Sequence, residues 1–310
     1  MSRVTAFPGQ QGQLPPGGDL VQPFQIEGPG LRGRLVQLGP AVDTILTRHD
    51  YPPAVAGLLA EALTLAAALS AALKYDGVFT LQIKGSGPVK MLVADVTSAG
   101  ALRGYAEVEG VVPSPREAKD APVKHLVGEG YLAFTVDQGT HTERYQGIVE
   151  LTGDTLVDSV HHYFRQSEQF SAAVRLATGR GEDGAWRSGA LMLQRLPDKE
   201  RIVVREERDE DWRRAVILMT SASDAELLDP ELDPRELLYR LFHEDGVRVF
   251  EPHGLAFGCR CSRERAARIL ASLPRAEVAE LTVDRKVTVT CQFCNTTETF
   301  DEEQIDALFE

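Results

Sequence analysis

The sequence predicts a mixed α+β protein with three parts: an N-terminal sheet with packed helices, a mainly helical linker, and a small C-terminal zinc-binding module. Three observations support this prediction. Up to about residue 200, apolar residues recur mostly with the two-residue period of strands, with a few helical stretches between them. A strongly charged segment with short helical patterns follows. All four cysteines of the chain lie beyond residue 258.

Length and composition are those of an ordinary globular protein. The 310 residues can form one sizeable core and a smaller unit, and 43% of them are hydrophobic. A net charge of −13 argues against general affinity for phosphate backbones. Residues 255–310 are not basic either, because seven Lys and Arg face ten Asp and Glu there. We therefore expect no nucleic-acid partner.

The N-terminal residues predict a flexible extension over residues 1–23. They are rich in Pro, Gly and Gln and contain no apolar segment of the kind that secretory signals need. Paired thiols in a chain without an export signal indicate a reducing compartment, so we expect a cytoplasmic protein.

Residues 24–199 are expected to form the core domain. A strand is predicted at 33–36 and an amphipathic helix at 40–48. The most apolar stretch, 53–73, begins with Pro, which suits the first turn of a helix. Its length would allow a membrane span, but Glu61 lies near its middle and small residues supply much of its length. We therefore expect a core helix and no membrane partner.

The period then changes to two residues. Strands are predicted at 78–83, 89–96, 102–108, 131–136, 145–151, 174–178 and 191–196, with a helix ending near Gln169 before the last two. The sequence Gly85-Ser86-Gly87-Pro88 indicates a turn. It is not a phosphate-binding loop, since no Gly-Lys-Ser/Thr follows it.

A charged segment separates this region from the C-terminal part. From Arg195 to Arg214, fourteen of twenty residues are charged, which indicates a boundary or a solvated connector. Short helical patterns follow at 215–218, 225–228 and 236–243, interrupted by prolines. We predict that residues 200–254 form a helical, metastable linker of low local stability.

Residues 255–310 contain the candidate metal ligands. Cys259 and Cys261 form a Cys-x-Cys pair, and Cys291 and Cys294 form a Cys-x-x-Cys pair after a spacer of 29 residues. Two chelating pairs of thiols are typical of a tetrahedral site for one Zn²⁺. Short strands are predicted at 287–290 and 296–300 around the second pair. Four unrelated thiols or two disulfides are the alternatives.

A module of this size needs a metal or a disulfide to fold, because it buries little apolar surface. Structural zinc contributes about 10–16 kcal/mol to such units, so its loss should unfold the module. Thiolate ligands are also oxidisable. Arg260, Arg263 and Arg265 near the first pair either stabilise thiolates or form a solvated helix face.

Several further motifs accompany the cysteines. They are His49-Asp50-Tyr51-Pro52, Leu73-Lys74-Tyr75-Asp76-Gly77, Gly85-x-Gly87-Pro88, Tyr145-Gln146-Gly147-Ile148-Val149, Gly153-Asp154-Thr155-Leu156, Tyr163-Phe164, Ser167-Glu168-Gln169, Leu241-Phe242-His243-Glu244 and Cys261-Ser262-Arg263-Glu264-Arg265. Together with the cysteine spacing they resemble the thirty-three-kilodalton heat-shock protein family, the redox-regulated holdase chaperones of bacteria. The resemblance covers roughly residues 24–310.

The resemblance implies a redox switch. The reduced protein would hold zinc through Cys259, Cys261, Cys291 and Cys294 and be inactive. Under oxidative stress, disulfides Cys259–Cys261 and Cys291–Cys294 would form, zinc would leave, and the module and linker would unfold to bind unfolding client proteins. The family also implies independence from ATP, a homodimer formed through the N-terminal domain, and transfer of clients to ATP-driven refolding chaperones.

Two other function classes stay open. One is an enzyme in the N-terminal region with a purely structural zinc ribbon, although the sequence contains no Gly-x-Ser-x-Gly, no phosphate-binding loop and no His-Glu-x-x-His. The other is a constitutive zinc-ribbon module that binds protein or RNA. Oxidation would abolish binding by such a module and create binding by the chaperone. We expect the chaperone, not an enzyme.

Overall fold

The computed structural model describes residues 18–118, 121–139, 145–167, 171–195 and 205–309. The chain forms two compact units, Met1–Phe257 and Gly258–Glu310. Residues 1–17 of the predicted extension lie outside the described part of the chain. The larger unit contains two six-stranded sheets, and the smaller unit contains a two-stranded sheet.

The first sheet of the larger unit, here called sheet A, is antiparallel. Its strand order is β10-β1-β2-β9-β8, and β11 also pairs with β1. The strands are β1 (Leu20–Ile26), β2 (Leu31–Leu38), β8 (Ala172–Arg180), β9 (Trp186–Arg195), β10 (Val247–Val249) and β11 (His253–Gly254). Strands from both ends of the larger unit therefore meet in one sheet.

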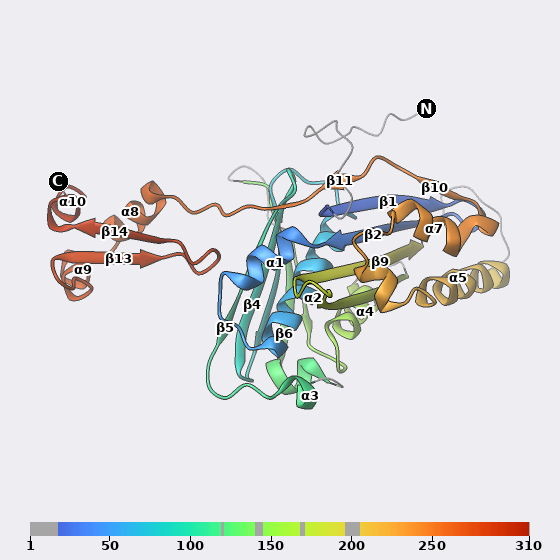
Figure 1. Ribbon diagram of the computed structural model, residues 1–310, viewed down its shortest axis with the longest axis horizontal. Helices are drawn as coiled ribbons and strands as arrows, with labels where there is room; N and C mark the ends of the chain where they lie inside the picture. Colours follow the sequence, from blue (N-terminus) through green and yellow to red (C-terminus); the bar gives the residue numbers. More distant parts are fainter. Residues whose placement is uncertain (1–17, 119–120, 140–144, 168–170, 196–204, 310) are drawn as a thin grey trace. The chain divides into compact units, whose positions relative to one another are not determined.

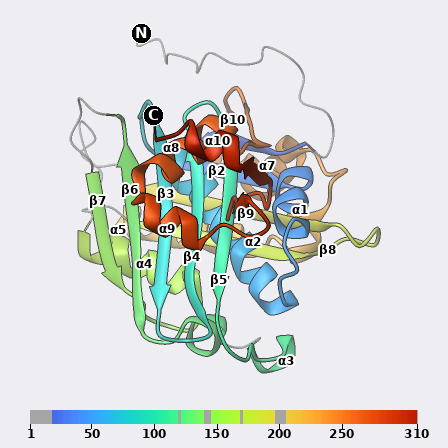
Figure 2. The same cartoon turned by 90° about the vertical axis from the view of Figure 1, so that its left-hand side faces the viewer.

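The second sheet, here called sheet B, has the order β12-β5-β4-β3-β6-β7. Figure 2 shows its five longer strands side by side. The strands are β3 (Val78–Gly85), β4 (Val89–Thr97), β5 (Ala101–Val108), β6 (Gly130–Asp137), β7 (Tyr145–Glu150) and β12 (Ala256–Phe257). Neighbours pair antiparallel except β12, which is parallel to β5.

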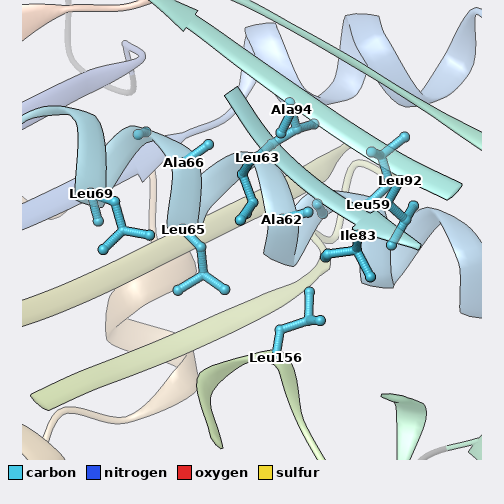
Figure 3. Packing of buried hydrophobic residues seen from close by; sticks show 14 of the residues in the cluster. Leu59, Ala62, Leu63, Leu65, Ala66, Leu69, Ile83, Leu92, Ala94 and Leu156 are labelled. Atoms are coloured by element: carbon cyan, nitrogen blue, oxygen red, sulfur yellow. The ribbon is translucent and has the colours of Figure 1, made fainter. Parts of the chain in front are cut away.

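Helix α2 (Pro53–Ser70) lies between the two sheets, as Figure 3 shows for Leu59, Leu63 and Leu65. It is long and apolar enough to cross a membrane, but 78% of that apolar window is buried inside the protein. The predicted core helix is thus observed. A helix that is apolar on nearly all sides must be covered on two opposite sides. The structure provides this cover with two sheets, whereas the sequence predicted one.

The remaining helical elements of the core pack on the sheets or on neighbouring helices. They are α1 (Pro40–Thr47), α3 (Pro115–Ala118), the π-helix η1 (Val123–Val127) and α4 (Leu156–Ser167). The start of α1 is held by Asp19, whose carboxylate accepts hydrogen bonds from the backbone N–H groups of Gly39 (2.7 Å) and Ala41 (2.8 Å). This contact satisfies donors that a helix N-terminus leaves open.

The described part of the predicted linker is mainly helical up to Asp245. It contains α5 (Arg205–Thr220), α6 (Asp224–Leu228), α7 (Pro234–Phe242) and the 3₁₀ turn η2 (His243–Asp245). Ser223 and Glu226 form a capping box at α6, and the Asp233 carboxylate caps α7. Pro234 therefore starts a helix instead of interrupting one. Residues 196–204, the first part of the charged segment, lie outside the described residues.

Two features differ from the elements expected at the domain edges. Strand β1 begins at Leu20, inside the segment 1–23 predicted as an extension. The segment 200–254 also contains strands β10 and β11, and the compact units divide after Phe257. These strands are only three and two residues long, so they show no period that a sequence could reveal. The division into four domains at 23, 199 and 254 stays a prediction.

Candidate metal centre and its connection to the linker

The smaller unit folds around a hairpin and three short helices. Strands β13 (Lys286–Thr290) and β14 (Thr297–Asp301) pair antiparallel, and the helices are α8 (Arg263–Ser272), α9 (Arg275–Glu280) and α10 (Glu302–Asp306). Both predicted strands of this region are observed within one residue of their expected ends. The buried core consists of six side chains: Ala266, Leu270, Val278, Val287, Phe300 and Ile305. Such a core is small for an independently folded unit.

The unit brings all four cysteines together. Cys259 and Cys261 lie just before Ser262, the N-cap residue of α8, and Cys291 and Cys294 lie in the turn between β13 and β14. Their Sγ atoms all lie within 4.8 Å of one another. Cys294 is buried, Cys261 is exposed, and the other two are half-buried.

The sulfur positions are compatible with a tetrahedral zinc site. The Sγ atoms of Cys259 and Cys291 lie 3.7 Å apart, and those of Cys261 and Cys294 lie 3.3 Å apart. Four thiolates about 2.3 Å from a central Zn²⁺ would lie about 3.8 Å from one another. The donor set is also the one that structural zinc prefers. Both of these distances join a sulfur of the first pair to a sulfur of the second.

Backbone hydrogen bonds form the turn that holds the second pair. The Asn295 N–H donates to the Cys291 carbonyl (2.8 Å), and the Cys291 N–H donates to the Thr296 carbonyl (2.9 Å). Asn295 has a φ of 55°, a left-handed conformation that Asn adopts more readily than most residues. The hairpin turn therefore points both sulfurs toward one centre.

The thiols have different proton affinities. Burial and the neighbouring thiols raise the pKa of Cys261 and Cys291. Burial also acts to raise the pKa of Cys294, but hydrogen bonds with Thr296 and with the Cys261 and Cys259 thiols outweigh it and lower that pKa to about 6. Thr296 contributes to the low pKa of Cys294 and was not predicted from the sequence as a residue of the site. A hydroxyl two residues after the last cysteine was the available signal.

The arginines near the first pair have structural partners. Arg263 pairs with Glu298 (3.0 Å), donates to the Thr299 carbonyl (3.0 Å) and lies over the Phe300 ring. Arg265 donates to the Arg260 carbonyl (2.7 Å). Of the two interpretations offered by the sequence, Arg263 fits neither fully, because it joins α8 to the hairpin.

In the larger unit, the contact between the linker helices and sheet A also bears on function. The linker helices cover one face of sheet A, and we call this contact the linker interface (Figure 1). On the sheet it consists of Phe24, Ile26, Leu31, Leu35, Ala173, Ala177, Leu191 and Leu193; on the linker it consists of Ala215, Met219, Ala222, Leu227, Leu237, Leu238, Leu241 and Phe242. At its centre the rings of Phe24 and Phe242 stack with centroids 5.7 Å apart.

The chain runs from this interface to the cysteines along sheet edges. Strands β10 and β11 pair with β1, and β12 pairs with β5. The ring of Phe257, the last residue of β12, lies under the Arg48 guanidinium at 4.5 Å. Phe257 is two residues before Cys259. We call residues 247–257 the connecting strap.

Comparison with known proteins agrees with this architecture. Residues 19–301 match the family model described as Hsp33 protein. A 33 kDa chaperonin of Caulobacter vibrioides is 40% identical over 283 residues, which cover 89% of this chain and 93% of the relative. One from Photobacterium profundum is 37% identical over 93% of this chain and 94% of its own.

A solved structure is similar as well. The crystal structure of the 33 kDa chaperonin of Thermotoga maritima, a heat shock protein 33 homologue, aligns with a TM-score of 0.80. It is 26% identical in sequence, and the alignment covers 94% of this chain and 97% of that one. On the fold, the family model and these relatives, the chain belongs to the Hsp33 family of chaperones.

Proposed function

We propose that this protein is a redox-regulated holdase that works without ATP. In the reduced state Cys259, Cys261, Cys291 and Cys294 hold one zinc ion per chain. When bound, the ion supplies the cross-link that folds the smaller unit, worth about 10–16 kcal/mol in comparable modules. The cluster of four sulfur atoms within 4.8 Å supports this assignment.

Oxidation then removes the ligands. The two zinc-bound thiolates of each pair give two electrons to an oxidant such as hydrogen peroxide and form one disulfide, Cys259–Cys261 or Cys291–Cys294. The peroxide takes up two protons from the solvent and leaves as two water molecules. A sulfur in a disulfide is no longer a thiolate donor. Six buried side chains do not hold the unit together without the metal, so we expect the smaller unit to unfold.

The linker interface carries the proposal. Its helices cover an apolar face of sheet A, and the chain continues from them to Cys259 through the connecting strap. The strap is weakly held, because its strands have three, two and two residues. Unfolding of the smaller unit would remove the ordered end of this strap and lower the cost of releasing the helices. Release exposes apolar surface on both partners, which can bind unfolding proteins.

The remaining functional assignments follow from family membership. We propose that the protein acts in the cytoplasm under oxidative stress and forms a homodimer through the larger unit. It would pass bound clients to ATP-driven refolding chaperones. The surface that clients contact is, on this proposal, the linker interface.

The test compares aggregation of a thermally unfolding enzyme in the presence of the reduced, zinc-loaded protein and of the peroxide-treated protein. We expect suppression only after oxidation, together with zinc release measured with a coloured chelator, and reversal by a dithiol. A variant with Cys291→Ser and Cys294→Ser should suppress aggregation without oxidant. Equal behaviour of both redox states would refute the switch and favour a structural zinc ribbon.

A further inference from the structure

A cavity of about 270 Å³ lies in the larger unit, between the two sheets where α2 ends. One wall is polar and cationic. It is formed by Arg32 and Arg34 on β2 and by Gln194 and Arg195 on β9. Arg32 and Arg34 are on the face of β2 that is opposite to Leu31 and Leu35, because successive side chains of a strand point to opposite faces. The two arginines of β2 therefore lie on the face of sheet A opposite the linker interface, and Arg195 at the end of β9 reaches linker helix α5.

The opposite wall is aromatic. The rings of Phe134 and Tyr163 lie 4.7 Å apart, and Phe79 and Phe164 extend this cluster with centroid distances of 6.2 and 5.6 Å. All four rings are at most 6% exposed. The hydroxyl groups of Tyr163 and Tyr145 lie 2.9 Å apart. Such an apolar surface with a few polar groups is the usual composition of a small-molecule site.

The aromatic wall is held in a fixed position by its packing. A Cβ atom at Gly147 on β7 would lie 2.7 Å from the Tyr163 ring, so this ring packs directly on the backbone of sheet B. The mouth of the cavity is accessible, since the side chains of Leu73 and Tyr145 are 41% and 52% exposed. The cavity is thus preformed and open to solvent on one side.

Arg34 has unused hydrogen-bonding capacity. It is only 9% exposed, its Nη1 donates to the Gln194 side chain at 2.6 Å, and its buried Nε–H has no partner. Burial, together with the charge of Arg32, lowers the pKa of Arg34 to about 10. A buried charged donor without an acceptor is costly. An acceptor that entered the cavity would relieve that cost.

The charge of the cavity is positive. Arg195 is paired with Asp209 at 2.8 Å, but none of the described residues that line the cavity is acidic. Among the described residues of this wall, Arg32 and Arg34 have no carboxylate beside them. A planar guanidinium binds a carboxylate through two parallel hydrogen bonds, and the apolar wall opposite excludes a strongly hydrated ligand.

We propose that this cavity binds a small organic monocarboxylate, with its carboxylate on Arg34 and Arg32 and an aromatic or branched apolar body against Phe79, Phe134 and Tyr163. The volume supports this class. A cavity of about 150 Å³ holds a benzene molecule, so the space here accommodates one ring with a short acid side chain. The site is distinct from the cysteines, and ligand binding needs no change of redox state.

The test uses the full-length, reduced and zinc-loaded protein with phenylacetate as the probe, measured by isothermal titration and protein-observed NMR. We expect saturable binding with a Kd of about 0.1–1 mM, as befits a ligand of about ten heavy atoms. Phenylacetamide, which has the same shape without the charge, should bind at least about tenfold more weakly. Phenyl phosphate tests whether a phosphate group is preferred.

Substitutions locate the site. Arg34→Met should weaken binding of phenylacetate by about tenfold to hundredfold, the range expected for loss of a charged hydrogen bond. Arg32 is exposed, so Arg32→Gln should fold normally and still weaken binding. Leu73→Glu should weaken binding by adding a negative charge at the mouth, whereas Leu73→Gln should not. Arg116→Gln, an exposed arginine outside the cavity, is the matched control.

Each outcome decides the proposal. Binding that depends on Arg34 and Arg32 but not on Arg116 supports it. The absence of saturation up to about 10 mM, equal binding of phenylacetamide, or equal losses in Arg32→Gln and Arg116→Gln would overturn it. A clear preference for phenyl phosphate would overturn the assignment to carboxylates. None of these measurements depends on holdase activity.

Discussion

Phe242 offers the most direct test of the linker interface. Its side chain is fully buried and stacks on Phe24 with an angle of 21° between the rings. Truncation of a buried Phe to Ala costs about 3–5 kcal/mol, including the loss of the aromatic pair. If the helices open as a local unit, this loss raises their open population by at least about a hundredfold.

We therefore expect Phe242→Ala to activate the protein without oxidant. Hydrogen exchange measured by mass spectrometry should show lost protection in α5, α6 and α7, and aggregation of the unfolding enzyme should be suppressed in the reduced state. Zinc content should equal that of the unsubstituted protein, because Phe242 belongs to the larger unit. Tyr239→Ala is the matched control, since Tyr239 is on the same helix and 64% exposed; it should change neither property.

Two results would refute this reasoning. If Phe242→Ala loses protection in the linker helices but does not suppress aggregation, the covered face of sheet A is not the client surface. If the helices keep their protection, the interface is more stable than its contacts imply. Loss of zinc from the same variant would mean that opening of the linker helices also destabilises the smaller unit.

Three further predictions rest on separate contacts. A Cβ at Gly33 would lie 2.0 Å from the buried Phe24 ring, so Gly33→Ala should displace this ring, lower linker protection by about 1–3 kcal/mol and partly activate the reduced protein; unchanged hydrogen exchange would contradict this. Burial raises the pKa of Glu61 to about 7, which makes the folded state less stable as pH rises from about 4.5 through 7. Glu61→Gln should therefore raise the Tm at pH 8 by the equivalent of at most about 3 kcal/mol and change it little at pH 5; an equal effect at both pH values would refute the assignment. Removal of zinc by a chelator under reducing conditions should unfold Gly258–Glu310 and leave the larger unit folded, as seen by NMR, with recovery on adding zinc; retention of the hairpin signals would show that the metal is dispensable.

The family and the candidate ligands could be predicted from the sequence because their signals are local. Four cysteines in two closely spaced pairs indicate a metal site wherever the rest of the chain lies. The long apolar segment around Leu63 predicts a core helix, and alternation around residues 287–300 predicts the hairpin of the smaller unit. Each of these features depends on residues close together in the sequence.

The linker interface could be anticipated only in part. Leu237, Leu238, Leu241 and Phe242 recur on one face of a helix, which indicates burial, but the surface that they cover is built from strands at the start and the middle of the chain. Likewise, Arg34 gave no sign of being buried, because an arginine in a short strand normally faces solvent. Its burial follows from the second sheet and α2 packing on the same face of β2.

The sequence by itself therefore determined the cysteine cluster, the core helix, the helical character of the linker and the family. The tertiary structure decided that there are two sheets, which face the linker covers, and that an aromatic and cationic cavity remains between them. The physical reason is sequence separation: Phe24 pairs with Val249, and no local pattern reveals a partner so far along the chain. Short edge strands such as β11 and β12 exist only because a neighbouring strand offers free backbone hydrogen-bonding groups.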